Sequence, residues 1–519
     1  MAVDLPPPLP PQQAELSQVQ RGEALSVIPF QQYQIHVMGA RVLDDAALAA
    51  TVAGADTLSN AVRALAAAYF AAGYPAAQLS YALSGQDLFV LATLGGISSV
   101  KAGEPLGKYF EGLNGVTPLT DESLEPRRLL ATMHADRAGI NAQPLLIADG
   151  SGGYAFDLKP DKIPADPTQV RVEYGNPGNR FVARHFLDLD LRGGTWYGDE
   201  LRALTRAGLR GLNEKPGDDY FEQNLGWNRV TQWGVFGIGG RYVDYTVDNP
   251  SPATPQNGNI WVGEGYWVYP WEADFDSRIM SLLKVDRTSK STEQTGALGA
   301  MTRIQHELYT SVEAGGTVSQ AFQLLAHRWD FDGGLAARVG LGDGSSATNP
   351  VDFNYVLYRP TARLKVYFTE TVLTTLEASA QITSDTVPEQ QQFVLGGFGS
   401  LTSYLPGVAI GDTGYLVRLI GEAGTYPLYG VEFKPKVFVE TGGVRFENTP
   451  QAGPVPTPAE AERQATPMLT DIGVELGVKL LGFVDAAVAY AESMAESDVA
   501  DGTLRGSDAN VYFRVAVKF

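Results

Sequence analysis

The stretch FVLGGFGSLTSYLPGVAIGDTGY, residues 393–415, has the glycine content of a phosphate-binding loop, and that is the first chemistry it suggests. It contains six glycines but no lysine or arginine. A phosphate loop also needs a strand before it and a helix N-terminus after it, whereas apolar, alternating segments flank this stretch on both sides. We therefore exclude phosphate binding, and the role of the stretch depends on the elements that position it.

Other residues that commonly carry catalysis form no motif. Five histidines are scattered along the chain: His36, His134, His185, His306 and His327. None lies in an HExxH pair, and with no cysteine in the chain a zinc site is not expected. The chain has no GxSxG motif, and GGFGSL lacks the third glycine of a dinucleotide fingerprint. Carboxylates such as Asp188, Asp190 and Glu200 are interpreted as lining water, so the sequence predicts no enzyme, no metal site and no cofactor.

Composition narrows the class of protein. Among 519 residues there are 57 glycines, 23 tyrosines and 22 phenylalanines, a mixture that favours strands and turns. The formal net charge of −20 argues against nucleic acid as a partner. No run of eighteen apolar residues is present, so no helical membrane span is expected. The N-terminus MAVDLPPPLPPQQ has neither a basic nor an apolar leader region, so the chain is either not exported or a mature form without its leader.

Strict alternation of apolar and polar residues dominates the C-terminal two-thirds. In NVYFRVAVKF the apolar face is formed by Val511, Phe513, Val515, Val517 and Phe519. The opposite face carries the charges, and the same period of two recurs in LTDIGVELGVKLL, VRVEYG and ARHFLDLDLR. This period predicts β-strands with one wholly apolar face.

Three features favour a transmembrane barrel over a soluble β-architecture, which is the alternative. The segments are about ten residues long, the length of a tilted strand that crosses a bilayer. Their polar faces carry many glycines and charges of both signs, which suit a water-filled lumen. Aromatic residues gather near segment ends, as in YWVYPW (266–271) and WGVF (233–236). We predict an antiparallel transmembrane β-barrel of about 16 strands over residues 165–519.

The first third of the chain has a different periodicity. A proline-rich linker at residues 1–28 precedes two small α/β modules, at 29–95 and 96–164. In the first module, YQIHVMG predicts a strand, TLSNAVRALAAAYFAAGY predicts a helix capped by Thr57 or Ser59, and AQLSYAL with DLFVLAT predicts a hairpin. The order is repeated more loosely by ISSVKAG, DESLEPRRLLATMHADRAGI, AQPLLIAD and GYAFDLKP. No plug helix is expected in residues 11–21.

The order of these modules resembles a known family. YFAAGYPAAQL followed by FVLATLGGISSVKAG resembles a POTRA domain. NPGNRFVARHFLDLDLRGGTWYGDELRAL resembles the first two barrel strands of the TpsB transporters of two-partner secretion. Residues 393–415 are similar to the sixth extracellular loop of that family, which is expected to fold into the lumen. The corresponding positions are Leu395, Gly396, Gly397, Ser400, Thr402, Ser403, Tyr404, Gly411, Asp412 and Gly414.

The sequence departs from the family at the tip of this loop. The family carries an arginine there, but Thr402 and Ser403 occupy the arginine and glycine positions. In the family the arginine pairs with an acid on the barrel wall, whose motif is matched here by Phe438, Glu440 and Gly442. We expect hydrogen bonds from Thr402 and Ser403 to hold the loop tip instead.

The missing arginine leaves the wall carboxylate in need of a partner, because a buried carboxylate without a cation is costly. Either lumen water solvates Glu440, or another cation neutralises it. Arg418, with Glu422 four residues further on the same face, is one candidate. Lys436, which shares a face with Glu440 four residues earlier, is the other.

The resemblance implies an outer-membrane translocator. Its periplasmic POTRA domains would capture an unfolded TpsA-like exoprotein, which would leave through the lumen. The barrel would be a monomer in outer-membrane lipid, inserted by the barrel assembly machinery with Phe519 as the C-terminal signal. The alternatives are an insertase that assembles other barrels, or a pore or scaffold component of an outer-membrane complex. A plain pore would not need residues 26–160.

Overall fold

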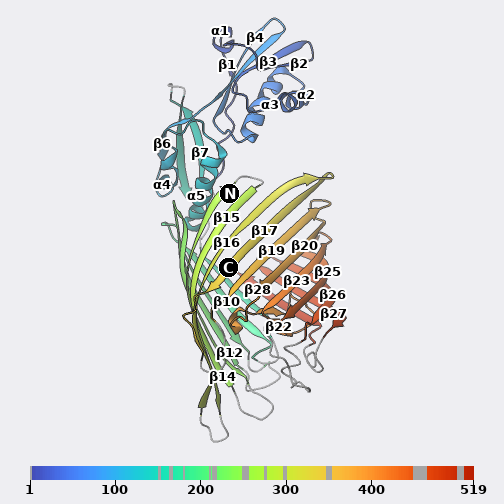
Figure 1. The fold of residues 1–519 in the computed structure, drawn as a ribbon. Coiled ribbons are helices and arrows are strands. Elements are labelled where there is room, and N and C mark those ends of the chain that lie inside the picture. The colour runs from blue at the N-terminus through green and yellow to red at the C-terminus, as the bar shows by residue number, and fades with distance from the viewer. Residues whose placement is uncertain are drawn as a thin grey trace.

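The computed structural model describes residues 3–149, 153–162, 168–178, 182–209, 212, 219–247, 256–273, 277–295, 301–346, 353–447, 465–498 and 508–519. Figure 1 shows two small α/β domains at one end of a closed β-barrel, with the first domain farther from the barrel than the second. None of the helices in the described part of the chain combines the length and the hydropathy of a membrane span.

Sixteen long strands close into the barrel, and each pairs with both neighbours in the antiparallel sense. The long strands are β9 (Gln169–Gly175), β10 (Phe186–Gly194), β11 (Asp199–Gly208), β12 (Asp219–Thr231), β13 (Gly234–Val247), β14 (Gln256–Ala273), β15 (Ser277–Thr295), β16 (Met301–Leu324), β17 (His327–Gly340), β19 (Val356–Tyr367), β20 (Leu373–Thr383), β23 (Thr413–Glu422), β25 (Val431–Arg445), β26 (Met468–Leu480), β27 (Val484–Ser497) and β28 (Val511–Lys518). Two short strands, β18 (Ser345–Ser346) and β24 (Tyr426–Leu428), pair with β16 and β25. The predicted barrel is confirmed, and closure leaves it without a free sheet edge.

Alternation along the strands separates an apolar outer face from a polar lumen. In β26, Ile472, Val474 and Leu476 are 46%, 52% and 43% exposed on the outer surface. Side chains of this kind are stable on a lipid-facing wall. Inward-facing charges are paired instead, as between Asp188 and Arg206 at 2.7 Å. The mixed-charge lumen expected from the sequence is therefore present.

The first α/β domain has a five-stranded sheet in the order β1–β4–β5–β3–β2. Its elements are β1 (Gln12–Gln13), α1 (Leu16–Val19), β2 (Ser26–Phe30), β3 (Tyr33–Gly39), α2 (Asp45–Ala53), α3 (Leu58–Ala71), β4 (Ala77–Ser84) and β5 (Asp87–Leu94). The predicted strand, long helix and hairpin are confirmed, and the Thr57 side chain caps α3 by accepting from the Asn60 amide. The sequence did not predict β2, because five residues that include a proline give too short a pattern.

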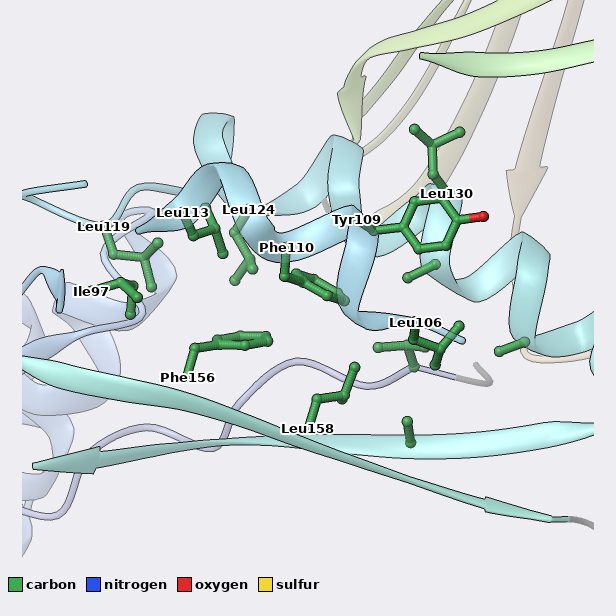
Figure 2. Close-up of a cluster of buried hydrophobic side chains, with 14 of the residues drawn as sticks. Ile97, Leu106, Tyr109, Phe110, Leu113, Leu119, Leu124, Leu130, Phe156 and Leu158 are labelled. Carbon is green, nitrogen blue, oxygen red and sulfur yellow. The ribbon is translucent and has the colours of Figure 1, made fainter. Parts of the chain in front are cut away.

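The second α/β domain packs α5 (Asp121–Ala138) on a three-stranded sheet in the order β6–β8–β7. Its other elements are β6 (Ile97–Ala102), α4 (Gly107–Phe110), η1 (Glu111–Leu113), β7 (Ile140–Ala148) and β8 (Tyr154–Lys162). Figure 2 shows its core, where the ring of Phe110 faces that of Phe156, with 4.8 Å between the ring centroids. A capping box between Thr120 and Ser123 begins α5, and Gly139 at φ +62° ends it.

The N-terminal segment lies along both α/β domains. Val3 forms a bridge to Ala142 of β7 and is completely buried. Nine residues later, Gln12 pairs with Ser80 of β4 in the parallel sense. The helix α1 packs on the first domain, where Val19 is also completely buried. The proline-rich segment is therefore anchored at both ends.

Polar contacts and a shared core attach the second α/β domain to the barrel. The Nε2 atom of His134 lies 2.8 Å from the carbonyl oxygen of Trp196, so Nε2 carries the proton and donates. In the neutral ring Nδ1 then accepts from the Tyr109 hydroxyl at 2.7 Å. That hydroxyl also lies 3.0 Å from the carbonyl oxygen of Val230 in β12. Val230 itself belongs to the apolar core of the domain, so the core continues into the barrel rim.

This junction is expected to weaken at acid pH. Burial is the largest influence and lowers the pKa of the His134 imidazole; the hydrogen bond to the Trp196 carbonyl opposes it, and the nearby charges of Lys108 and Arg137 add smaller lowering effects. An undocked, solvated histidine has a pKa of about 6.5. The undocked state therefore binds protons more readily, so docking is fully stable above about pH 6.5 and loses stability as the pH falls below it.

Hydrogen exchange of α5 amides, corrected for the intrinsic pH dependence, measures this effect. We expect exchange to accelerate between about pH 7.5 and about pH 5.5 in the unmodified protein. The variant His134→Gln, which keeps a donor and an acceptor without a titratable ring, should show a much smaller change. The same acceleration in both proteins would contradict the role of His134.

Candidate functional site

Residues 384–412, here called the lumen loop, connect β20 to β23 and lie inside the barrel. Near the start of the loop, the side chain of Gln391 accepts a hydrogen bond from Arg338 of β17 at 2.6 Å. Further along, the amide of Thr402 donates to Glu440 of β25 at 2.6 Å. Between β17 and β25 lie the long strands β19, β20 and β23, so the loop contacts the inner wall on both sides of the strands that it connects.

The lumen loop contains a short helix and a small hairpin. The helix is η3 (Glu389–Gln391), and the hairpin pairs β21 (Phe393–Leu395) with β22 (Ala409–Gly411). Residues 413–415, which the sequence assigned to the loop, instead begin β23. Their backbone continues the ladder of the barrel wall, which the glycine-rich composition of the stretch concealed.

Positive backbone angles let the loop fold back on itself. Gly396 and Gly397 have φ angles of +98° and +95°, values that favour glycine. A Cβ atom on Gly396 would lie 2.2 Å from the carbonyl oxygen of Leu405. The amide of Gly397 donates to the carbonyl of Tyr404 at 2.8 Å, which closes the turn. We call residues 398–405 the loop tip.

Main-chain hydrogen bonds fix the loop tip to two carboxylates on the wall. The amide of Thr402 binds Glu440, and the amide of Ser403 donates to Asp471 of β26 at 2.7 Å. All four residues are buried. The Thr402 hydroxyl accepts from the amide of Gly399 at 3.1 Å and so shapes the tip itself. Thr402 and Ser403 thus hold the tip to the wall as expected, but through their backbone amides rather than through their side chains.

Arg418 is the cation that contacts Glu440. Its Nε atom donates to Glu440 at 2.6 Å, and its Nη1 atom donates to Glu377 at 2.9 Å. Strand register explains this, because Glu377, Arg418 and Glu440 lie directly opposite one another on β20, β23 and β25. Asp471 continues the same row on β26. Cross-strand neighbours on one face are close enough for such pairs.

Lys436, the other candidate cation, does not contact Glu440. Its Nζ atom lies 3.6 Å from Glu475, which stands opposite it on β26. On the other side Lys436 is opposite Glu422, which is half-buried. The structure therefore brings Arg418 and Glu440 together, whereas Lys436 and Glu422 face each other four residues further along β25 and β23.

Tyr404 extends the contacts of the tip to the last two strands of the barrel. Its hydroxyl lies 2.6 Å from the hydroxyl of Ser493 and 2.7 Å from the carboxylate of Glu496, both on β27. Its carbonyl oxygen accepts from the hydroxyl of Tyr512 of β28 at 2.6 Å. The ring of Tyr404 is completely buried, in an apolar cluster that includes Leu395.

A carboxylate of the loop itself, that of Asp412, holds its base. Asp412 accepts from the amide of Val387 at 3.1 Å and from the amide of Glu447 at 2.9 Å. Leu395 is buried against Gly442 of the wall, where a Cβ atom would lie 3.0 Å from the leucine side chain. Close approach of the hairpin to β25 thus requires glycine at that position.

The remaining predicted residues contribute packing or backbone hydrogen bonds. Gly411 and Gly414 allow close packing, since added Cβ atoms would lie 2.6 Å from the backbone of β25 and 2.4 Å from a ring of β21. The amide of Ser400 donates to the carbonyl of Gly397, just before the tip, at 2.8 Å. Phe438 is buried, whereas Phe519 is 76% exposed at the end of the chain.

Sequence reasoning missed a second polar anchor of the loop. The side-chain oxygen of Gln391 accepts from Arg338 and, at 3.2 Å, from Arg359 of β19. Beside it, Glu389 pairs with Lys290 of β15 at 2.5 Å. The polar run PEQQQ before the glycine-rich stretch was the available signal.

A cavity of about 600 Å³ adjoins this second anchor. Charged residues of both signs from β11 to β19 line it, together with Gln390 and Gln391 of the lumen loop. Within the described ranges, no three histidine, aspartate or glutamate side chains gather as metal ligands would. The interior is thus lined by polar and charged side chains and is partly filled by the lumen loop.

Fold and loop together define a class of protein, a large membrane barrel with an internal loop and two α/β domains at one rim. The sequence matches no protein-family model and no curated protein sequence. The fold is similar to that of solved structures. CdiB from Escherichia coli aligns with a TM-score of 0.69 at 16% identity, covering 98% of this chain and 92% of that one.

Two further structures show the same likeness. CdiB from Acinetobacter baumannii aligns with a TM-score of 0.64 at 12% identity, over 96% of this chain and 91% of that one. BamA from Haemophilus ducreyi, in a form lacking POTRA domains 1–3, aligns with a TM-score of 0.51 at 12% identity, over 94% and 99%. The chain therefore has the fold of these barrels, with a 16-stranded transmembrane barrel and POTRA-like domains, as the sequence predicted.

The Arg418–Glu440 pair yields a test of how the tip is held. Replacing Arg418 by methionine leaves a completely buried carboxylate without its cation, a change that costs about 3–5 kcal/mol for a buried pair. We expect a clear fall in the melting temperature of the detergent-solubilised barrel. Lys436→Met is the matched control, because its more distant pair should contribute at most about 1 kcal/mol. Equal melting temperatures for the two variants would refute the assignment.

Proposed function

We propose that this chain is an outer-membrane translocator that moves an unfolded exoprotein from the periplasm to the cell surface through the barrel lumen. The observation that carries the proposal is the lumen, which is lined by paired charges and partly filled by a loop. Barrels of sixteen strands are wide enough to leave an aqueous channel, so a loop inside one controls passage. Displacing the lumen loop would free the conduit.

The chemistry of the lumen suits an extended polypeptide. Acidic and basic side chains already neutralise one another, as in the pairs Asp190–Arg202 and Glu222–Arg241 at 3.0 Å each. A client therefore meets hydrogen-bonding groups without a strong field of one sign. Contacts of that kind are weak enough for the chain to move on.

The α/β domains would form the receiving end. In the second domain, β6 and β7 are the edge strands of the described sheet, and Val3 already bridges Ala142 of β7. An extended client can add to the rest of these edges by backbone hydrogen bonds. The domain is fixed to the rim through His134 and Tyr109, so a captured client lies next to the lumen. We place these domains in the periplasm, where no nucleotide is available, so folding outside the cell would make transport unidirectional.

One observation favours a second candidate, an insertase that assembles other barrels. The strands that close the barrel, β9 and β28, pair over only five residue pairs, from Arg514–Gly175 to Lys518–Arg171. A short seam of this kind can part and admit a strand from the side. The two candidates differ in the route of the client, through the lumen or through the wall.

Comparison of proteomes tests the proposed function directly. Deleting the gene should remove one or two large β-rich proteins from the culture supernatant and the cell surface, while the barrels of the outer membrane stay at their usual abundance. A joint fall of many outer-membrane barrels would show an insertase. No change in either fraction would leave a pore or scaffold and would refute export.

A disulfide across the seam separates the two routes. The chain has no native cysteine, so Val172→Cys with Val517→Cys creates a single pair at directly opposite positions. We expect export to continue when this pair is oxidised, because the client passes through the lumen. The control pair, Val474→Cys with Tyr490→Cys, joins β26 to β27 away from the seam. Loss of export only in the oxidised seam variant would favour lateral passage.

A further inference from the structure

Among neighbouring long strands of the described barrel, β9 and β28 have the fewest paired residues. Their seam contains five residue pairs, whereas β9 with β10 and β27 with β28 have seven each. Beyond the last pair, the backbones of Val170 and Phe519 exchange hydrogen bonds of 3.3 Å and 2.9 Å. Backbone pairing between these strands therefore covers only part of β28.

A side chain continues the seam beyond Gly175. The Nδ2 atom of Asn176 donates to the carbonyl of Val511 at 2.9 Å, and its Oδ1 atom accepts from the amide of Phe513 at 2.7 Å. Asn176 is nearly buried, so these bonds are sheltered from water. The backbone amide of Asn176 also donates to the carbonyl of Phe513 at 3.2 Å, so this one residue holds the edge of β28 beyond the last β9 pair.

The loop tip supports the same half of β28 from inside the barrel. The Tyr512 hydroxyl donates to the carbonyl of Tyr404 at 2.6 Å, and the amide of Ala509 donates to the carbonyl of Ser403 at 2.9 Å. Leu405 packs against Ala509 and Tyr512 in a buried apolar cluster. Tyr512 is 2% exposed, so its hydroxyl would lose a buried partner if the tip left.

An aromatic contact adds to this support two residues further along β28, at Arg514. The guanidinium of Arg514 lies 5.6 Å from the centroid of the Phe398 ring. Phe398 also lies beside Tyr512, with 6.1 Å between ring centroids. The two ends of the tip therefore both contact the closing strand.

The other contacts of the tip are on strands remote from the seam. Glu440 belongs to β25 and Asp471 to β26, and the Arg418 that holds Glu440 belongs to β23. Together with Tyr404 on β27 and β28, the tip joins five consecutive strands of the wall. The tip is therefore a direct physical connection between the closing strand and the wall at β25.

We propose that the loop tip is a brace for the barrel seam, so that the position of the loop and the closure of β9 against β28 are coupled. With the tip at rest, Tyr512 and Ala509 are satisfied and the short seam is held shut. When the tip withdraws, β28 loses these partners and the seam loosens at the Asn176 end. The inference rests on the proposed function and deepens it: when the lumen loop withdraws to open the conduit, the pairing of β9 with β28 weakens.

Hydrogen exchange of the full chain in lipid nanodiscs tests the coupling without any client. Tyr512→Phe keeps the ring and removes the hydroxyl, so exchange in peptides covering residues 169–175 and 511–518 should rise by about threefold to tenfold. The matched control is Tyr426→Phe, which removes a hydroxyl that donates to a carbonyl at 2.7 Å in a distant turn. It should leave the seam peptides unchanged.

Remote variants show whether the tip transmits the effect. Glu440→Gln weakens the tip anchor on β25, three strands from β28, and should raise exchange in the seam peptides. Gly396→Ala, strained at φ +98°, moves the tip without altering the wall and should do the same. Coupling is reciprocal, so Tyr512→Phe should also raise exchange of the Thr402 and Ser403 amides.

Unchanged seam exchange in both Glu440→Gln and Gly396→Ala, with each protein folded by its heat-dependent mobility, would overturn the proposal. This result is independent of the export assay. Export with an uncoupled seam would refute the brace alone, and a coupled seam without any exported client would refute the translocator alone.

Discussion

The interior of this barrel depends on one buried carboxylate, that of Glu440. A charge removed from water costs several kcal/mol unless it is both paired and hydrogen-bonded. Arg418 supplies the opposite charge, and the amide of Thr402 supplies a further hydrogen bond. The first contact requires the register between β23 and β25, and the second requires the path of the lumen loop. A single side chain therefore makes the wall and the loop depend on each other.

The position of the cation determines how firmly the loop is held. If the guanidinium were on the loop, withdrawal would separate two buried charges, which costs about 3–5 kcal/mol. Here Arg418 belongs to the wall and stays with Glu440 when the tip leaves. The departing tip gives up two amide hydrogen bonds to carboxylates, each of about 1.5–3 kcal/mol, and lumen water can replace them. The loop is thus ordered at rest and released at lower cost.

Alternation in the sequence was sufficient for the barrel because the direction of a strand side chain depends only on parity. Parity does not give register, and register decided the site. Arg418 and Lys436 both share a face with Glu440, but only Arg418 lies directly opposite it. Which residue stands opposite depends on the lengths of the turns and on how all the strands pair. A local sequence pattern gives neither of these. Gln391 was missed for a related reason, since its partner Arg338 is 53 residues earlier in the chain.

The second α/β domain is attached to the barrel rim by apolar contacts, whereas the loop tip is attached to the wall by polar ones. Water affects these two attachments differently. At the rim, Val230 and Val235 of the barrel are buried in the core of the second α/β domain. Water cannot replace apolar contacts, so undocking the domain exposes surface at a cost proportional to its area. The bonds of the loop tip to Glu440 and Asp471 are polar and lie beside a wet lumen, where water can take their place. Withdrawal of the loop tip therefore costs less than undocking of the second α/β domain, so the domain is the more firmly held of the two.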